Sequence, residues 1–198
     1  DVLIEVSPTN LKDGEPALSY IQGALKHQFH VITANKGPLA LAFPALMELS
    51  MYNHVSLRFS GTVGAGTPLL ALGKNGLHGD QVSSIKGILN GTTNYILTQM
   101  TESGASFADG LLEAQSLGYA ESDPTNDVDG LDAAAKLVIL ANWVMNRSIT
   151  LQDVHIKGIR QVTPVKIAEA KNKQQVIKLL ASITEHEAIV QPELLRQT

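Results

Sequence analysis

Apolar and polar positions change from strand-like to helix-like spacing along the first fifth of the chain. Apolar residues crowd residues 1–8 and 30–37, as expected of strands in a buried parallel sheet. Between them, residues 16–28 place apolar side chains on one helical face, behind a proline that fits the first turn of a helix. A strand, a helix and a second strand in this order predict a βαβ unit, the building block of a doubly wound sheet.

The middle of the chain continues with strand and helix patterns in turn. We predict strands over 54–63 and 81–90, and helices over 38–52, 91–100 and 107–117. A glycine-rich loop over 60–68 separates two of these elements, and its three glycines allow a close approach to a ligand. This part of the chain therefore also predicts an α/β arrangement.

The last third begins with a segment, residues 131–144, that is apolar on nearly every side and predicts a buried helix. A short strand over 155–160 and a helix that begins near Pro164 follow. Residues 174–195 are ambiguous, because their first half has helical spacing but can also form a strand.

Composition narrows the function classes. The chain has 198 residues, of which 44% are hydrophobic and 17% charged, with a net charge of −4. This is ordinary for a soluble globular protein of one or two domains, and no basic excess indicates a nucleic-acid partner. The absence of cysteine excludes disulfides, thiol nucleophiles and cysteine metal sites. No apolar stretch is long enough to span a bilayer, so we expect no membrane partner and a cytoplasmic location.

The densest polar chemistry lies just before and inside the apolar helix. Residues 121–129 contain four acids around Pro124. Asp132 and Lys136 follow in the helix, four residues apart and therefore on one face. A charged pair on a largely buried helix is costly unless specific contacts hold it. The pattern indicates either a polar pocket for a small charged substrate or a structural ion pair beside a solvated turn.

Two further groups lie where ligands commonly bind. In a doubly wound sheet, ligands bind at the carboxyl ends of the strands. Ser7 and Thr9 follow the first predicted strand, and Asn35 and Lys36 follow the second, so both pairs are expected on the same rim. The alternative for Lys36 is an exposed loop lysine.

The second group opens the helix predicted from Gly91. Backbone N–H groups and hydroxyls at a helix start suit an anionic ligand group. The alternative is ordinary capping by Thr92 or Thr93.

Three stretches of the chain resemble the homoserine dehydrogenases: VITANKGPLAL at 31–41, GILNGTTNYIL at 87–97, and GYAESDPTNDVDGLDAAAKLVILA at 118–141. That family interconverts L-homoserine and L-aspartate 4-semialdehyde with NAD or NADP, in threonine, methionine and isoleucine biosynthesis. The resemblance implies an α/β fold with a partial Rossmann-type doubly wound cofactor domain and an α/β catalytic and dimerisation domain with a mixed sheet. It also makes residues 174–195 two paired strands.

The resemblance further implies where the domains divide. Residues 1–40 would be a remnant of the NAD(P)-binding Rossmann domain, and residues 41–198 the catalytic and dimerisation domain. A G-x-G-x-x-G turn is absent, since the glycines of 61–68 have the wrong spacing. By this comparison the chain begins partway through the cofactor domain and stops before the family's C-terminal end.

Site residues carry over from the resemblance position by position. Lys136 matches the family's proton donor, and Asp132 would orient it. The matching substrate-binding positions are Glu121, Asp127, Gly91, Thr92 and Tyr119. The cofactor-binding positions are Ser7, Thr9, Asn35 and Lys36. A sodium-like monovalent cation would be held by backbone carbonyls of Ser60, Val63, Ala65 and Thr67, although Ser60 stands where relatives often have an acid.

The resemblance implies a homodimer and leaves three questions open. The residue that distinguishes NAD from NADP lies outside these motifs. The chain could be a non-catalytic fragment of a homoserine dehydrogenase, or part of a dehydrogenase that acts on another small amino-acid aldehyde.

Overall fold

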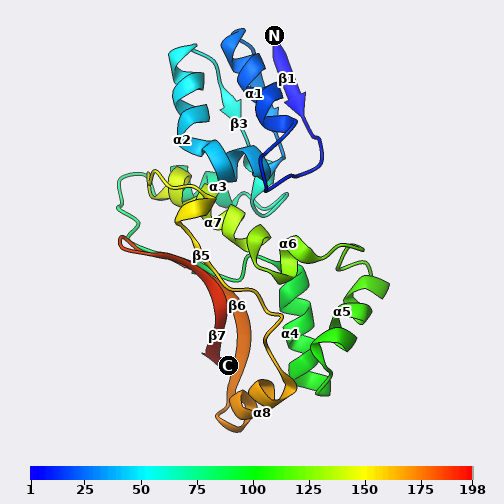
Figure 1. Cartoon of the computed structure of the whole chain (residues 1–198). Coiled ribbons are helices and arrows are strands. Elements are labelled where there is room, and N and C mark those ends of the chain that lie inside the picture. Colours follow the sequence, from blue (N-terminus) through cyan, green and yellow to red (C-terminus); the bar gives the residue numbers. More distant parts are fainter. Residues whose placement is uncertain (198) are drawn as a thin grey trace. The chain divides into compact units, whose positions relative to one another are not determined.

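A computed structural model describes residues 1–197, and the chain divides into two compact units (Figure 1). Unit 1 comprises Asp1–Ile85, Ala135–Val154 and Thr184–His186. Unit 2 comprises Lys86–Ala134, His155–Ile183 and the chain from Glu187 onward. The predicted boundary near residue 40 concerns a cofactor and a catalytic domain and stays a prediction.

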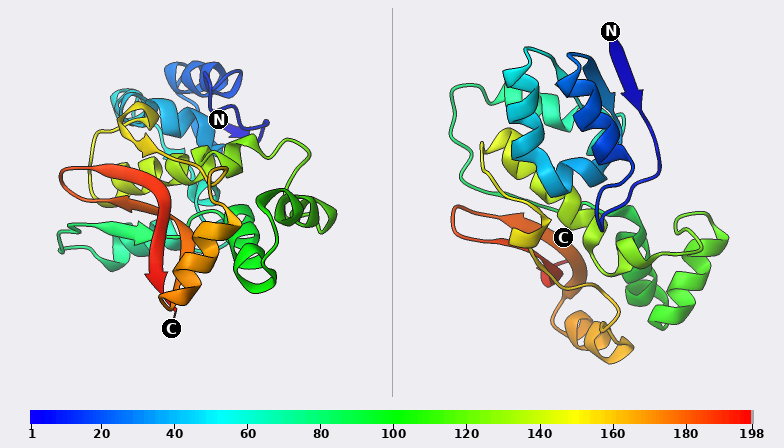
Figure 2. Two further views of the ribbon diagram at one scale, coloured as in Figure 1. Left: turned by 60° about the horizontal axis from the view of Figure 1, so that its bottom comes forward. Right: turned by 45° about the horizontal axis from the view of Figure 1, so that its top comes forward.

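Unit 1 is built on a three-stranded parallel sheet in the order β1-β2-β3. The strands are β1 (Val2–Glu5), β2 (His30–Thr33) and β3 (Leu57–Arg58), and the crossovers are α1 (Ala17–Lys26) and α2 (Lys36–Tyr52). α1 packs against β1 and β2, and α2 packs against α1 and β3 (Figures 1 and 2). The predicted βαβ unit is confirmed.

Strand residues alternate between the two faces of this sheet. Val31 and Leu57 are buried, as are the polar Glu5 and Thr33, whereas Val2, Ile4 and Ile32 are 56%, 66% and 46% exposed. Apolar side chains on both faces are typical of strands in a doubly wound sheet.

Element bounds in unit 1 differ from the predicted ones for local reasons. α2 begins at Lys36 because the side chain of Asn35 accepts a hydrogen bond from the Gly37 N–H and caps the helix. The predicted strand over 54–63 is shortened to β3, since Thr62 donates both its N–H and its hydroxyl to the Phe59 carbonyl and turns the chain. Short helical turns were not predicted: η1 (Ser60–Thr62), α3 (Leu69–Ala71), the π-helix η2 (Leu72–Gly76) and η3 (Leu151–Asp153).

Unit 2 contains a four-stranded mixed sheet in the order β4-β6-β7-β5. Its strands are β4 (Ile85–Gly87), β5 (His155–Ile156), β6 (Gln175–Ile183) and β7 (Ala188–Arg196). β6 and β7 pair antiparallel from Gln175↔Arg196 to Ile183↔Ala188, and β5 pairs parallel with β7. The prediction of strands over 174–195 is confirmed. The helical spacing of the first half misleads because β6 lies inside the sheet, where consecutive residues on both faces can be buried.

The helices of unit 2 are α4 (Gly91–Ser103), α5 (Phe107–Ser116), α6 (Thr125–Val128) and α8 (Pro164–Asn172). α4 packs against α5 and β6, and α8 also packs against β6 (Figure 1). Asn90, Ser106 and Thr163 cap α4, α5 and α8 with their side chains. The predicted acidic loop over 121–129 thus contains a short helix, α6.

α7 (Leu131–Val144) is the apolar helix expected from the sequence. Residues 133–135 and 137–141 are all at most 3% exposed, which confirms that it is buried on most sides. The boundary between the units falls inside this helix, after Ala134. Within residues 1–197, no helix is long and apolar enough to cross a membrane.

Candidate active site

The carboxyl ends of β1 and β2 are joined through Glu5, a residue that the sequence patterns did not single out. Its side chain is buried, and its Oε1 accepts hydrogen bonds from the Ser7 N–H at 2.7 Å and the Ser7 hydroxyl at 2.5 Å. Its Oε2 accepts from the Thr33 hydroxyl at 2.7 Å. A lone acid in the apolar run VLIEV is the signal that could have revealed it.

Asn35 continues this network. Its Nδ2 donates to the carbonyls of Ser7 at 3.2 Å and Pro8 at 3.3 Å, while its Oδ1 accepts from the Gly37 N–H at 3.0 Å. The structure therefore brings Ser7 and Asn35 together on the predicted rim, with the Asn35 amide bonded to backbone. The hydroxyl of Thr9 makes no hydrogen bond to any of residues 1–197, and Lys36 begins α2.

The buried Glu5 carboxylate should make unit 1 sensitive to acid. Burial by itself raises the pKa of Glu5, but the hydrogen bonds from Ser7 and Thr33 outweigh it, so the pKa lies below its ordinary value of 4.5. A lowered folded-state pKa stabilises the protein above the unfolded-state pKa, and this stabilisation is lost as the pH falls through the folded-state value. Glu5→Gln should therefore reduce the pH dependence of the unfolding free energy below pH 4.5.

Urea unfolding at a series of acidic pH values measures this dependence. Glu48→Gln, at an exposed position of α2, is the control and should keep the wild-type slope. An unchanged slope in Glu5→Gln would show that the proton uptake belongs to other groups.

In unit 2, the buried side chain of Asn90 bridges two of the predicted site residues. Its Nδ2 donates to Asp127 Oδ1 at 2.6 Å and to Asp132 Oδ2 at 2.8 Å. Its Oδ1 accepts from the Thr93 N–H at 2.8 Å and the Thr93 hydroxyl at 2.9 Å. Because the Thr93 N–H can only donate, the Asn90 side-chain oxygen must face it, and the Asn90 nitrogen must face the two carboxylates. Asn90 was missed by the sequence patterns, although its place directly before a predicted helix is that of an N-cap.

This arrangement creates a negative region at the start of α7. Two carboxylates that meet at one amide nitrogen repel each other, so the Asn90 bridge is needed to hold them together. Asp132 is buried, and Lys136 is half-buried one helical turn later in α7. Chemically, paired carboxylates of this kind can bind an ammonium group.

The remaining predicted substrate residues surround the start of α4. The Thr92 hydroxyl donates to the Tyr119 carbonyl at 2.6 Å, and the Tyr119 ring stacks on Tyr95 with a centroid distance of 4.6 Å. Gly91 is the first residue of α4 and is exposed. Glu121 is exposed, and its carbonyl accepts from Gln115 Nε2 at 3.0 Å. In unit 2 the structure thus gathers Gly91, Thr92 and Tyr119 in one group and Asp127 and Asp132 in another.

The predicted cation loop lies in unit 1. Ser60 opens η1, Val63 is buried, and Ala65 has a left-handed backbone with φ of 48°. The Thr67 N–H donates to the Gly64 carbonyl at 2.8 Å, and the Thr67 carbonyl accepts from the Leu69 N–H at 2.7 Å. Among residues 1–197, no group of three or more His, Cys, Asp or Glu side chains is arranged to hold a metal ion.

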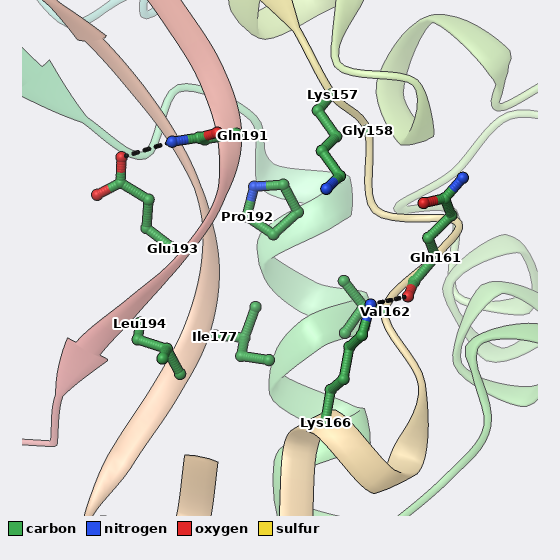
Figure 3. Close-up of a pocket in the computed structure, with 10 residues that line it drawn as sticks. All are labelled: Lys157, Gly158, Gln161, Val162, Lys166, Ile177, Gln191, Pro192, Glu193 and Leu194. Atoms are coloured by element: carbon green, nitrogen blue, oxygen red, sulfur yellow. Dashed lines mark hydrogen bonds between the residues drawn. The ribbon is translucent and has the colours of Figure 1, made fainter. Parts of the chain in front are cut away.

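Unit 2 also has a surface cavity of about 160 Å³, and none of the predicted site residues lines it (Figure 3). Val162, Ile177 and Pro192 form apolar parts of its wall. Lys157, Gly158 and Gln161 line it from the segment that follows β5.

Comparison with known proteins assigns this chain to a family. The family model described as homoserine dehydrogenase matches residues 68–198, which is more than half of the chain. The chain belongs to the homoserine dehydrogenase family. The resemblance seen in the three sequence stretches is therefore confirmed.

Relatives of this homoserine dehydrogenase family extend the match to nearly the whole chain. A homoserine dehydrogenase of Methanocaldococcus jannaschii is 47% identical over 195 residues, covering 98% of this chain and 58% of the relative. An NAD(+)-dependent homoserine dehydrogenase of Pseudomonas canavaninivorans is 42% identical over 200 residues, covering 98% of this chain and 56% of the relative.

A crystal structure of a homoserine dehydrogenase from Thiobacillus denitrificans matches with a TM-score of 0.93 and 34% identity, over 100% of this chain and 46% of that one. This match confirms the predicted α/β fold. The chain thus spans about half the length of the relatives that it matches.

Proposed function

We propose that this chain carries the catalytic residues of an NAD(P)-dependent homoserine dehydrogenase, which interconverts L-homoserine and L-aspartate 4-semialdehyde in threonine, methionine and isoleucine biosynthesis. Membership of the family supports the proposal. The observation that carries it in the structure is the Asn90 amide, which holds Asp127 and Asp132 together at the start of the helix that bears Lys136. Acids held in this way suit a site that handles ammonium groups.

Lys136 is the proposed proton donor. Reduction of an aldehyde requires a proton at the forming alkoxide oxygen, from a group within hydrogen-bond reach. Asp132, one helical turn earlier on the same face of α7, is the residue proposed to orient the Lys136 amine toward that oxygen.

Substrate recognition is assigned to residues of unit 2. Glu121 would bind the amino group of homoserine, and Asp127 would support either Lys136 or the substrate. Gly91 and Thr92 lie at the N-terminus of α4, where backbone N–H groups favour an anionic group. Tyr119 is coupled to Thr92 by the hydrogen bond from the Thr92 hydroxyl to its carbonyl.

Cofactor binding is assigned to Ser7, Thr9, Asn35 and Lys36, on the rim of unit 1. The Thr9 hydroxyl, which bonds to none of residues 1–197, and the Ser7 turn that Asn35 anchors fit a polar ligand. When bound, NAD or NADP exchanges the hydride with the substrate carbon, while the protein supplies position and electrostatics. In this proposal residues 1–40 belong to the cofactor domain and residues 41–198 to the catalytic domain.

Two finer features belong to the same proposal. Carbonyls of Ser60, Val63, Ala65 and Thr67 would hold a monovalent cation; the left-handed turn at Ala65 supports a loop that can expose carbonyls. The enzyme would act as a homodimer through the catalytic domain, and light scattering of the complete protein measures its mass in solution.

The test is homoserine-dependent formation of NADH or NADPH by the complete protein. Comparison of L-homoserine with L-serine and other small amino alcohols separates this proposal from a dehydrogenase of another aldehyde. The 198-residue chain assayed alone tests whether it is a non-catalytic fragment. The proposal fails if the complete protein reduces neither cofactor with homoserine.

Gly91→Ala is expected to separate substrate binding from folding. A Cβ at Gly91 would meet no atom within 4 Å, and alanine favours the helix, so the unfolding free energy should stay the same or rise by up to about 1 kcal/mol. A substrate group that approaches the Gly91 backbone would meet the new methyl group, so the KM for homoserine should rise several-fold. Steady-state kinetics with urea unfolding check both values, and an unchanged KM would remove Gly91 from the substrate site.

A further inference from the structure

The segment that follows β5 lies against the backbone of the turn between α6 and α7. The Ile159 N–H donates to the Val128 carbonyl at 2.8 Å. A Cβ on Gly158 would lie 2.2 Å from the Val128 oxygen and 2.5 Å from the Asp129 Cα, distances that no real side chain tolerates. Glycine at this position therefore allows the two backbone segments to touch.

Arg160 adds a side-chain contact to the same turn. Its Nε donates to Asp129 Oδ1 at 2.5 Å and its Nη2 to Asp129 Oδ2 at 3.3 Å. Two parallel hydrogen bonds fix the relative orientation of a guanidinium and a carboxylate. The two side chains are 48% and 38% exposed, and exposed ion pairs contribute little to stability. This pair therefore fixes the orientation of the turn, although it adds little to the free energy of unfolding.

The turn held in this way carries the acidic pair. Val128 and Asp129 lie between Asp127 and Asp132, the two residues that Asn90 bridges. Asn90 fixes the two carboxylates through their oxygens, and residues 158–160 fix the backbone between them. Gly158 and its neighbours Lys157 and Gln161 also line the surface cavity (Figure 3).

We propose that Arg160 is a positioning residue for this reaction: its paired hydrogen bonds to Asp129 hold the α6–α7 turn so that Asp127 and Asp132 both meet the Asn90 amide. The importance of Arg160 for homoserine turnover rests on the proposed function, whereas its effect on the position of the Asn90 amide is independent of that function.

The experiment compares Arg160→Gln, Arg160→Lys and Asp129→Asn in the complete protein. Lys86→Gln is the matched control, because it removes another exposed ion pair of unit 2, the 2.9 Å contact between Lys86 and Glu193. Arg160→Gln should lower kcat/KM for homoserine roughly 10- to 100-fold, since small displacements of catalytic groups cost this much. The KM for the cofactor should not change. Arg160→Lys should recover part of the loss, and the double variant with Asp129→Asn should lose no more than either single one.

A second readout does not depend on activity. The side-chain amide resonances of Asn90 in ¹H–¹⁵N spectra should move in Arg160→Gln and stay in place in Lys86→Gln. Wild-type kinetics together with unmoved Asn90 resonances in Arg160→Gln would overturn the positioning role. If the wild-type protein does not turn over homoserine, the proposed function fails, and the Asn90 resonances alone then decide whether Arg160 positions the acidic pair.

Discussion

Replacing Lys136 with alanine is expected to lower homoserine turnover by roughly 10²- to 10⁴-fold, the range for loss of a general acid–base group. The methyl group of alanine can neither donate a proton to the forming alkoxide nor accept one from the homoserine hydroxyl. Homoserine should still bind, because Glu121, Asp127 and the start of α4 remain. The fold should survive as well, since alanine favours the helix and α7 is held by its apolar residues.

Steady-state kinetics of the complete protein measure this loss, with homoserine binding followed by calorimetry and unfolding followed by circular dichroism. Lys171→Ala, at an exposed lysine in the last turn of α8, is the control and should keep wild-type turnover. Near-normal turnover in Lys136→Ala would make Lys136 a structural partner of Asp132. Collapsed turnover with intact homoserine binding would establish it as the group that moves the proton.

Local patterns in the sequence were sufficient for most of the fold. Alternating and helical spacings report which faces of an element are buried, and burial decides most of these elements. The βαβ unit and the apolar helix α7 follow these patterns, whereas the β6–β7 hairpin was ambiguous from spacing and was predicted from the family resemblance. Short-range hydrogen bonds that spacing does not encode account for the differences, as where Thr62 ends β3 and where α6 forms inside the acidic stretch.

The polar network was harder to predict because it joins distant residues. Asn90 has the sequence signature of a helix cap, and its second contacts, to Asp127 and Asp132, lie 37 and 42 residues away. Glu5 meets Thr33 across 28 residues. Gly158 stands alone inside the predicted strand over 155–160, a pattern that indicates a bulge or a close backbone approach, but its partner, the Val128 backbone, is evident only in the structure. The family resemblance supplied Asp127, Asp132 and Lys136 as candidate site residues, whereas the Asn90 amide that holds the two acids is evident only in the structure.

Asn90→Asp is expected to cost about 3 kcal/mol of unfolding free energy at neutral pH, comparable to breaking a buried charged contact. Aspartate has nearly the same shape and caps helices as well as asparagine, so the bond from the Thr93 N–H can persist. The two donors to Asp127 and Asp132 disappear, and a third carboxylate takes their place.

Like charges at this distance raise the pKa of at least one of these carboxyl groups. A raised folded-state pKa of an acid means that stability is kept at low pH and lost as the pH rises through the unfolded-state value toward the folded-state one. Asn90→Asp should therefore recover stability on acidification, opposite to the wild-type trend that Glu5 imposes on unit 1. Urea unfolding of wild type and Asn90→Asp at several pH values measures these two opposite pH dependences of the unfolding free energy.

Asn142→Asp is the matched control for this substitution. Asn142 is as buried as Asn90, but its amide donates at 2.7 Å to the Ile149 carbonyl, and no carboxylate of residues 1–197 accepts from it. This variant should also lose stability, yet its folded fraction should keep the wild-type kcat, whereas Asn90→Asp should lose turnover together with stability. If both variants lose stability alike and both keep kcat, Asn90 is only the cap of α4. Asp127 and Asp132 would then not need the Asn90 amide to stay together. Their pairing would have to depend on the α6–α7 turn, which Gly158 and Arg160 contact.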